Sequence, residues 1–483
     1  MPLTDCKQGH ADAPTIASQL VATRVAAGAW ARIGLKARLD CLQRFRSKVV
    51  ESADELISAC SHVPNRCAGE TLASEIIPLA DAARYLVGSA ARILRPQTRR
   101  GWGLRMVTQH RPLGLILIIG PSNYPLFLPG VQVLQALAAG NGVILKPGAG
   151  GSAAAAVLKR LLASVGVPDD LLQVTPEATE CVAEVMAEGV DKLILTGSRM
   201  AGRAVTELIA QSRPTASVME LSGADAAIVL RGADIERAAA AIAFGLTFNG
   251  GATCMVPRRI LLEQTLADEF LRGLRHQLNR LPKIALNGSA WIRIAPLVDS
   301  VLQDGATVLH GQWSTEARVG PLLLGGVCRS SALQSTDQMG PVSMVETFST
   351  CDDLLANYER SPMRLGASIF GPVTAAQTLA RNLDAGCICI NDLLAPTGHP
   401  AVAISPRKDS GYGSTRGAEG LLEMTSPVTV IERYGRFLPH LVRANVEDDQ
   451  MLKDLLAFKH GCGSKIKASS LLRIIKRGGN SSS

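Results

Sequence analysis

The spacing of apolar residues divides the chain into two kinds of segment. Between residues 15 and 95 the apolar positions recur every three or four residues, as at Leu39, Leu42, Phe45 and Val49. This period predicts successive amphipathic helices, each packing one face on a core. From Pro112 onward the pattern changes to short apolar runs that alternate with turns and helical stretches.

The first alternating region extends to about residue 219. Residues 115–119 form a continuous β-type run, which is typical of a buried parallel strand. Further strands are predicted at 142–145, 171–174 and 192–195, with helices at 131–139, 152–165, 181–187 and 201–211. This alternation predicts an α/β fold with an open Rossmann-type sheet, which binds ligands beyond the carboxyl ends of its strands. A second α/β region is expected from Glu220 to about residue 398.

One cysteine, Cys254, follows the glycine pair Gly250-Gly251 and the apolar segment 238–246. Glycine lets the backbone adopt positive φ, so a thiol beyond such a turn can be presented to a cleft. A cysteine thiolate is a nucleophile. Two interpretations stay open from this stretch alone, because a free cysteine is also often a small hydrophobic residue of the core.

The composition narrows the classes of function. The chain has 483 residues, 47% of them apolar and 19% charged, which is an ordinary globular composition with room for two or three domains. A net charge of +8 fits either a polyanionic partner or a phosphate-bearing cofactor. Aromatic residues make up only 4% and no recognition-helix pattern is visible, so nucleic-acid binding is not expected.

Eleven cysteines without paired spacing predict free thiols and a reducing compartment, which we take to be the cytoplasm. Cys387 and Cys389 are too close together for a C-x-x-C redox or zinc pattern, and no metal site is predicted. The first residues lack the basic and apolar regions of a signal peptide. The apolar run 113–119 is far shorter than the ~20 residues that span a bilayer.

Several short motifs follow one another in an order that resembles the aldehyde dehydrogenase superfamily, from about Arg111 to about Thr425. In chain order they are Pro121-Ser122-Asn123-Tyr124-Pro125, Leu145-Lys146-Pro147, Thr196-Gly197-Ser198 with Gly202, Glu220-Leu221-Ser222-Gly223, the Cys254 loop, Gly340-Pro341-Val342, Ile390-Asn391 and 408–413. Each motif is weak by itself, whereas their order over most of the chain is specific. The short segment before the cysteine and the Asn-Tyr-Pro triplet are most similar to the class 3, or fatty-aldehyde, branch.

The resemblance implies NAD(P)-dependent oxidation of an aldehyde to a carboxylic acid. Cys254 would attack the carbonyl to give a thiohemiacetal, and loss of hydride would leave a thioester. The side-chain amide of Asn123 and the backbone N–H of Cys254 would stabilise the oxyanion. Glu220 would activate the water that cleaves the thioester. Arg259 matches an arginine of the family, although the residue by itself predicts an ordinary surface role.

The implied cofactor is NAD or NADP. There is no G-x-G-x-x-G pattern, but Gly197 and Gly202 stand where a strand turns into a helix, which allows a pyrophosphate to approach the helix N–H groups. Without the resemblance, an ordinary strand–helix connection explains this spacing equally well. By resemblance, Lys146 would contact the adenosine ribose or its phosphate. The other expected cofactor-binding residues are Ser122, Ser198 and Asp337.

The sequence departs from the family at several positions. The family usually has a glutamine where Ala252 stands and, where Ala149 stands, a glutamate that holds the ribose hydroxyls and repels a 2′-phosphate. Ala149 therefore favours acceptance of NADP. Met339 replaces an aromatic residue, and Ser405-Pro406 replaces a glycine pair. These changes keep open a catalytically weak homologue that acts as a binding or scaffold protein. A CoA-acylating enzyme is the other alternative, although such enzymes generally dispense with the base.

The expected domain organisation follows the same motifs. Residues 1–219 form the cofactor-binding domain with a hairpin element at about 95–111, residues 220–398 the catalytic domain, 399–445 a return to the cofactor or bridging region, and 446–483 a basic, partly disordered tail. The resemblance implies a homodimer or homotetramer in which the hairpin makes oligomer contacts. The tail departs from the family and interleaves basic with apolar residues. It fits a solvated tail, and also peripheral contact with an anionic membrane.

Overall fold

The computed structural model describes residues 15–101, 103–285, 288–314, 318–434 and 446–480. The chain divides into two compact units. The first comprises residues 1–97 and 108–428, and the second comprises residues 98–107 and 429–483. Both α/β regions predicted from the sequence lie in the first unit.

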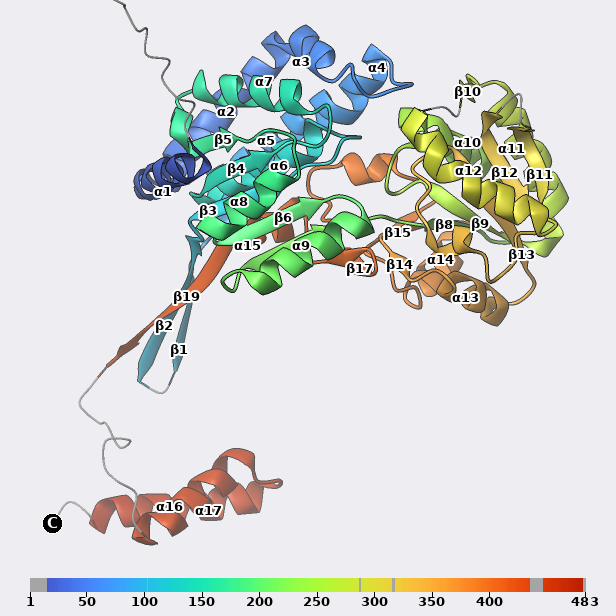
Figure 1. The fold of residues 1–483 in the computed structure, drawn as a ribbon. Helices are drawn as coiled ribbons and strands as arrows, with labels where there is room; N and C mark the ends of the chain where they lie inside the picture. Colours follow the sequence, from blue (N-terminus) through green and yellow to red (C-terminus); the bar gives the residue numbers. More distant parts are fainter. Residues whose placement is uncertain (1–14, 102, 286–287, 315–317, 435–445, 481–483) are drawn as a thin grey trace, which may run out of the picture. The chain divides into compact units, whose positions relative to one another are not determined.

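The N-terminal part of the first unit is helical, as the apolar period predicts (Figure 1). The helices are α1 (Ile16–Arg32), α2 (Leu35–Glu51), α3 (Ala53–Ala59), α4 (Ala68–Thr71) and α5 (Ile77–Ile93), with a π-helical turn at Leu72–Ile76 before α5. Leu42, Phe45 and Val49 of α2 are fully buried in the core that these helices share with the first sheet.

The first sheet has six strands in the described part of the chain, in the order β18-β7-β6-β3-β4-β5. They are β3 (Leu115–Ile119), β4 (Gly142–Lys146), β5 (Leu172–Val174), β6 (Lys192–Thr196), β7 (Ala216–Glu220) and β18 (Gly411–Tyr412). All pairs are parallel except β18 with β7. The accompanying helices are α6 (Phe127–Ala139), α7 (Ser152–Ala163), α8 (Glu180–Glu188) and α9 (Arg199–Gln211). Side chains from both faces of β3 are buried, which explains its unbroken apolar run.

The second sheet follows the path β10-β12-β13-β9-β8-β15-β16, with β11 paired to β12. Its strands are β8 (Asp225–Val229), β9 (Pro257–Glu263), β10 (Ile284–Ala285), β11 (Thr307–Trp313), β12 (Arg318–Gly325), β13 (Val342–Phe348), β15 (Gly366–Phe370) and β16 (Cys387–Ile390). Its helices are α10 (Ile235–Thr247), α11 (Ala267–Asn279), α12 (Gly288–Gln303), α13 (Cys351–Glu359) and α14 (Val373–Ala380). Only β10 and β11 run antiparallel to their described neighbour.

After the second sheet the chain returns to the first. The short strands β14 (Met363–Arg364) and β17 (Arg407–Lys408) pair with each other, β18 joins β7, and α15 (Gly417–Glu423) follows. Thr415, between β18 and α15, thereby comes close to the end of β7. This return places residues far apart in the sequence around one site.

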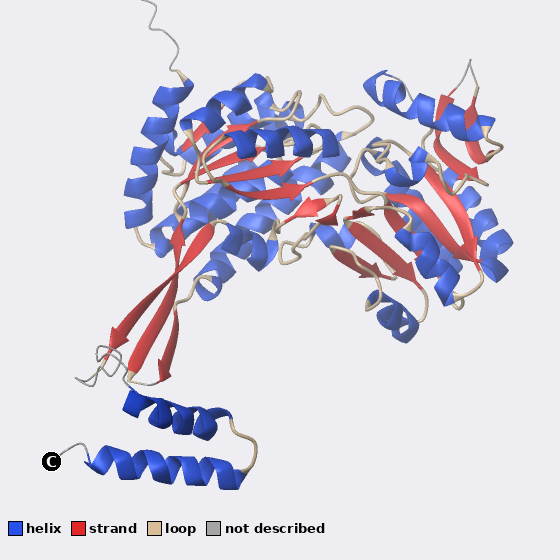
Figure 2. Cartoon of the chain, turned by 60° about the horizontal axis from the view of Figure 1, so that its bottom comes forward, coloured by secondary structure: helices blue, strands red, loops and turns tan. Residues whose placement is uncertain are grey.

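A three-stranded sheet has the order β1-β2-β19, and its first two strands lie near the range 95–111 in which a hairpin element is expected (Figure 2). Its strands are β1 (Gln97–Gly101), β2 (Leu104–Pro112) and β19 (Thr425–Arg433). Within the second unit, Arg105 Nη1 lies 3.3 Å from Glu432 Oε2. Part of the expected bridging region, residues 435–445, falls outside the described residues.

The tail forms two packed helices, α16 (Val446–His460) and α17 (Ser464–Asn480). Polar groups lie between them: Asp454 and Ser470 are buried, and Arg473 Nε donates to Asp454 Oδ1 over 2.7 Å. Apolar side chains face outward instead, with Leu456 61% and Leu472 59% exposed. Among the side chains of this pair that the structure describes, the fully buried ones are thus polar, and several leucines are exposed. α17 continues to Asn480, and residues 481–483 are not described. The partial disorder expected for the tail stays a prediction.

Candidate active site

The loop that carries Cys254 starts where α10 ends at Thr247. Asn249, Gly250 and Gly251 have φ values of 54°, 61° and 73°, in the left-handed region. A Cβ on Gly251 would lie 2.5 Å from Pro341 N, so a side chain does not fit there. The glycine pair therefore allows the tight turn that the sequence suggested. Cys254 follows it, before β9 begins at Pro257.

The buried side chain of Arg258 anchors this loop through hydrogen bonds to its backbone. Arg258 Nη2 donates to Gly251 O at 3.0 Å and to Thr253 O at 3.1 Å, and Nη1 donates to Gly340 O at 2.5 Å. Its guanidinium also pairs with Asp337 over 3.1 Å. Sequence reasoning missed Arg258, although a charged residue close to the apolar run 260–262 was a usable signal.

The surface role expected for Arg259 is wrong. The residue is fully buried, and its guanidinium donates to Asn357 O at 2.6 Å and to Tyr358 O at 3.2 Å, with Glu346 Oε1 at 3.5 Å. Since Arg259 is part of β9 at the centre of the second sheet, a surface position was not available to it. Its contacts hold α13 against the sheet.

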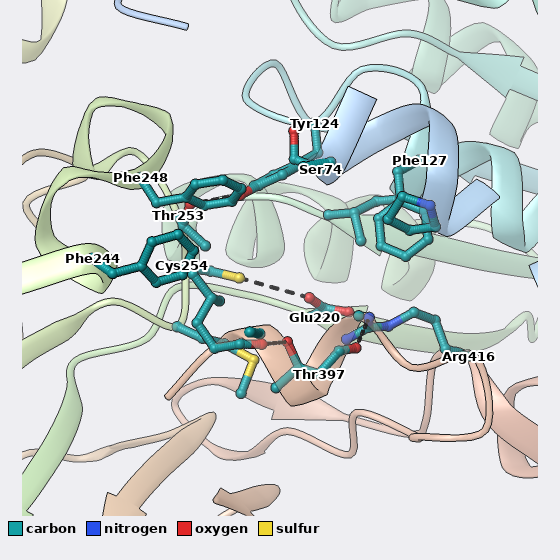
Figure 3. A pocket seen from close by; sticks show the side chains of 17 residues that line it. Ser74, Tyr124, Phe127, Glu220, Phe244, Phe248, Thr253, Cys254, Thr397 and Arg416 are labelled. Atoms are coloured by element: carbon teal, nitrogen blue, oxygen red, sulfur yellow. Dashed lines mark hydrogen bonds between the residues drawn. The ribbon is translucent and has the colours of Figure 1, made fainter. Parts of the chain in front are cut away.

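Glu220 and Cys254 face each other in the structure (Figure 3). Glu220 is the last residue of β7 and is buried, and its Oε1 accepts from Cys254 Sγ at 3.9 Å. Its other oxygen, Oε2, accepts from Thr415 Oγ1 at 2.6 Å. The hydroxyl of Thr415 thus fixes one carboxylate oxygen and leaves the other directed at the thiol.

Asn123 lies against the same loop, in the turn between β3 and α6. Its Nδ2 donates to Ala252 O at 2.8 Å, two residues before the thiol. Arg66 Nη1 donates to Asn123 O at 3.1 Å and pairs with Glu75 Oε1 at 2.9 Å, with both charged side chains fully buried. Glu75 Oε2 in turn accepts from the N–H groups of Leu126 and Phe127. The pair Arg66–Glu75, which sequence reasoning also missed, anchors the turn that positions Asn123.

Two cavities meet at Cys254 and Glu220. The first, of about 270 Å³, is mainly apolar and is lined among others by Phe127, Phe244 and Phe248. The second, of about 150 Å³, is lined among others by Pro121, Ser122, Asn123, Thr196, Gly197, Ser198, Asp337 and Met339. Both include Cys254 and Glu220 in their walls, so a molecule in either cavity has access to the thiol.

Comparison with known families decides the assignment. The sequence matches the aldehyde dehydrogenase family over residues 4–430. The chain belongs to the aldehyde dehydrogenase family. Members oxidise aldehydes with NAD or NADP as the hydride acceptor, and this aldehyde dehydrogenase is an oxidoreductase of that kind.

Curated relatives cover most of this aldehyde dehydrogenase. It is 30% identical to a 4,4'-diapolycopene aldehyde oxidase of Methylomonas sp, over 87% of this chain and 82% of the relative. It is 28% identical to a putative NADP(+) succinate-semialdehyde dehydrogenase of Mycolicibacterium smegmatis, over 86% and 84%. A probable coniferyl aldehyde dehydrogenase of Pseudomonas aeruginosa is also 28% identical, over 83% and 85%.

Solved structures agree on the fold. An NAD-dependent aldehyde dehydrogenase from Sinorhizobium meliloti has a TM-score of 0.79 at 25% identity, covering 88% of each chain. An NADP-dependent glyceraldehyde-3-phosphate dehydrogenase from Bacillus halodurans, complexed with NADP, has a TM-score of 0.80 at 24% identity, over 87% of this chain and 91% of that one. The class 3 branch of the family stays a prediction.

The residues expected to bind cofactor occupy different parts of the dehydrogenase. Ser122, Gly197, Ser198 and Asp337 line the second cavity. Gly202 lies in α9 beyond it, where an added Cβ would lie 2.7 Å from Leu221, so glycine permits close packing of the helix. Ser198 caps α9, since its hydroxyl accepts from Ala201 N–H at 3.1 Å.

Two further groups bear on whether a dinucleotide fits. Asp337 Oδ1 accepts from Arg258 and from Met339 N–H, while its buried Oδ2 has no partner among the described residues. Asp337 also contributes to the wall of the second cavity, where a carboxylate side chain suits the hydroxyl groups of a sugar. Lys146 ends β4 outside the lining of this cavity, and burial lowers the pKa of its amine. The second cavity thus suits a polar ligand with hydroxyl groups, such as one ribose of a dinucleotide.

The surroundings of Cys254 keep its thiol protonated at rest. Burial raises the pKa of the Cys254 thiol well above its ordinary value, and the carboxylates of Glu220, Asp225 and Asp337 raise it further. The positive charge of Arg416 acts in the opposite direction. Attack by sulfur therefore requires a base to remove the proton, and Glu220 is the group that the thiol already contacts.

Proposed function

We propose that Cys254, Glu220 and Asn123 form the catalytic machinery of an NAD(P)-dependent aldehyde dehydrogenase that releases a carboxylic acid. The observation that carries this proposal is the contact of 3.9 Å between Cys254 Sγ and Glu220 Oε1 at the meeting point of two cavities. The first cavity would hold the aldehyde and the second the nicotinamide end of the cofactor.

In the first half of the reaction, the Cys254 proton passes to Glu220 as sulfur attacks the carbonyl carbon. A C–S bond forms, and the carbonyl oxygen becomes an oxyanion within reach of donors. The backbone N–H of Cys254 and the second amide hydrogen of Asn123 would serve as these donors, since only one Asn123 hydrogen is needed for Ala252 O. Bound NAD(P) supplies the site with an acceptor for the hydride that leaves this carbon.

Before the second half, Glu220 releases the thiol proton to solvent. It then removes a proton from water, whose oxygen attacks the thioester carbon. The C–S bond breaks, sulfur takes up a proton, and the product is a carboxylic acid. The hydrogen bond from Thr415 keeps the carboxylate turned toward Cys254 between the two steps. This use of Glu220 supports the hydrolytic reaction over transfer of the acyl group to CoA.

One assay separates the proposal from its alternatives. The purified protein is mixed with an aldehyde panel and NAD or NADP, and reduced nicotinamide, carboxylic acid and, with CoA added, acyl-CoA are all quantified. We expect equal amounts of reduced cofactor and acid, with or without CoA. Acyl-CoA as the main product would assign the enzyme to the acylating type. If no cofactor binds in a calorimetric titration, the chain is a binding or scaffold protein instead.

We propose NADP acceptance because the turn after β4 carries Ala149 in place of an acidic residue. Ala149 is exposed and has no charge to repel a 2′-phosphate. The Mycolicibacterium smegmatis relative named above is described as an NADP(+) enzyme. The catalytic efficiencies with NADP and NAD, measured with one aldehyde, test this directly.

We also propose a homodimer or homotetramer with β1, β2 and β19 in its contacts, in a reducing compartment such as the cytoplasm. Support for the compartment comes from ten cysteines, all free, in the described residues. Support for assembly comes from the exposed edge and faces of this three-stranded sheet, in which every residue of β1 is exposed. Sedimentation equilibrium of the full chain gives the mass, and a monomer at micromolar concentration would contradict the assembly.

For the tail we propose peripheral contact with an anionic membrane surface. No described helix is long and apolar enough to cross a bilayer. However, α17 contains five basic and no acidic residues in its sequence, and the helix pair turns leucines outward. Full-length protein should sediment with vesicles of phosphatidylserine and phosphatidylcholine, but not with phosphatidylcholine alone. Combined Leu456→Ser and Leu472→Ser substitutions should weaken binding, and failure to sediment at low salt would refute it.

A further inference from the structure

Arg416 is a cation in the wall of the first cavity that the reaction described above does not use. It precedes α15, next to Thr415, and its side chain is 6% exposed (Figure 3). Its backbone has φ 61°, a conformation that residues with a Cβ rarely adopt. The chain thus keeps an arginine here despite local backbone strain and despite burial of the charge.

The guanidinium has few partners for its degree of burial. Nη1 donates to Thr397 O at 2.5 Å, and the group lies 5.6 Å from the centre of the Phe127 ring. Nε is buried without a partner among the described residues. No carboxylate of the described residues lies within 4.0 Å of the Arg416 nitrogens. One carbonyl and one ring face are a small share of what five N–H donors can use.

Other buried arginines of the described chain are satisfied differently. Arg258, Arg259 and Arg364 each have a carboxylate oxygen within 4.0 Å. Arg38 lacks one but donates to three backbone carbonyls. Arg416 alone of these five has neither arrangement within the residues that the structure describes. Burying a charge without a counter-ion costs desolvation free energy, and an anion bound in the cavity beside Arg416 would offset that cost.

We infer that the first cavity binds aldehydes that carry a second, anionic group, namely a carboxylate paired with Arg416. The inference rests on the proposed function, since it takes Cys254 as the residue that attacks the aldehyde end. The phenylalanine walls would contact the apolar part of the substrate, and the modest volume of about 270 Å³ favours a short chain or a single ring. An arginine suits a carboxylate because its planar fork donates two parallel hydrogen bonds.

The first test uses alkylation of Cys254 and needs no turnover. The sulfur displaces iodide from either iodoacetate or iodoacetamide and forms an S–CH₂ bond, so the two reagents differ chiefly in charge. Peptide mass spectrometry gives the ratio of their rates at Cys254, with exposed Cys351 as the internal reference. Arg416→Met should lower the iodoacetate-to-iodoacetamide ratio at Cys254 by about tenfold or more, because charged hydrogen bonds are lost.

The matched control is Arg84→Met, which removes an exposed arginine of α5 that pairs only with neighbouring Asp81 in the described chain. It should leave the ratio unchanged, and Arg416→Lys should keep part of the preference. The lysine variant also preserves the test if the methionine variant does not fold. An unchanged ratio in Arg416→Met and Arg416→Lys would overturn the inference.

The second test compares isosteric substrates, 4-oxobutanoate with 4-methylpentanal and 4-carboxybenzaldehyde with 4-isopropylbenzaldehyde. We expect kcat/KM of the wild-type enzyme to favour at least one acid of these pairs, and Arg416→Met to lose that preference mainly through KM while still oxidising the neutral aldehyde. Equal loss for both members would show that Arg416 positions Glu220 instead. Oxidation without preference for either acid would refute this inference alone, whereas no oxidation of any aldehyde would refute the proposed function.

Discussion

The two cavities on either side of Cys254 are lined by different kinds of chemical groups. The second takes its walls from the carboxyl ends of β3 and β6, from hydroxyl groups and glycines, and from the segment around Asp337. The first takes its walls from phenylalanines of α6, α10 and the cysteine loop, from the π-helical turn, and from the returning segment with Arg416. Backbone groups at strand ends suit a ligand shared by many enzymes, whereas side chains on five separate segments suit a substrate particular to one.

The largest effect is expected from removing the atom that both cavities share. Cys254→Ser replaces the thiol by a poor nucleophile, so kcat/KM for aldehydes should fall by about 10⁴-fold or more, measured as reduced nicotinamide formed. Cofactor binding should persist, because the second cavity keeps its other walls. Cys351→Ser, a change at an exposed cysteine, is the control. Retention of full activity in Cys254→Ser would remove this residue from the mechanism.

The contrast between the cavities also explains what the sequence could predict. The second cavity consists of contiguous motifs, so Ser122, Gly197, Ser198 and Asp337 could be named in advance. The first cavity consists of single residues from many segments. Arg416 follows the recognised motif 408–413 by three residues, but nothing in the sequence indicates that it faces the thiol.

The same limit applies to the residues beneath the site. Strands and helices followed from the apolar period, because burial on both faces of a parallel sheet leaves a direct trace in the sequence. Buried ion pairs leave no such trace. Arg66, in the loop before α4, pairs with Glu75 of the π-helical turn and contacts the Asn123 turn, and Arg258–Asp337 joins residues 79 positions apart. A single sequence predicts each charge as exposed, as it did for Arg259.

The second-largest effect is expected from replacing Glu220, which lies in the walls of both cavities and is proposed as the catalytic base. Glu220→Gln keeps the shape of the side chain but removes the base, so kcat should fall by about 10²–10⁴-fold. If the base is needed for thioester cleavage, the acyl-enzyme should accumulate and be visible by intact mass spectrometry. A variant with normal kcat would assign proton transfer to another group. Glu51→Gln, on the exposed face of α2 beside Lys48, provides the control.

A smaller effect is expected at the cofactor end. Ala149→Glu introduces a negative charge on the exposed turn after β4 without touching the first cavity. Like-charge repulsion should raise KM for NADP relative to NAD by about tenfold, as expected for one partly solvated charge pair. Relative rates across the aldehyde panel should not change. A shift in aldehyde preference would show that the two cavities are not independent.

The smallest effect concerns stability, and it comes from a carboxyl group beneath the Cys254 loop. Asp225 accepts from Gly366 N–H at 3.0 Å, and burial raises the pKa of its carboxyl to about 8. Because this pKa is higher in the folded state than the ordinary value of 3.8, the folded protein binds the extra proton between these two pH values. The stability that this group contributes is thus complete below pH 3.8 and is lost as pH rises toward 8.

Asp225→Asn cannot ionise, so its free energy of unfolding should fall less than that of the wild type between pH 5 and about 8, as read by urea titration. Parallel curves for the two proteins would show that Asp225 does not change its protonation on unfolding in this range. An Asp225 carboxyl that is ionised in both states would then act together with Glu220 in raising the pKa of the Cys254 thiol.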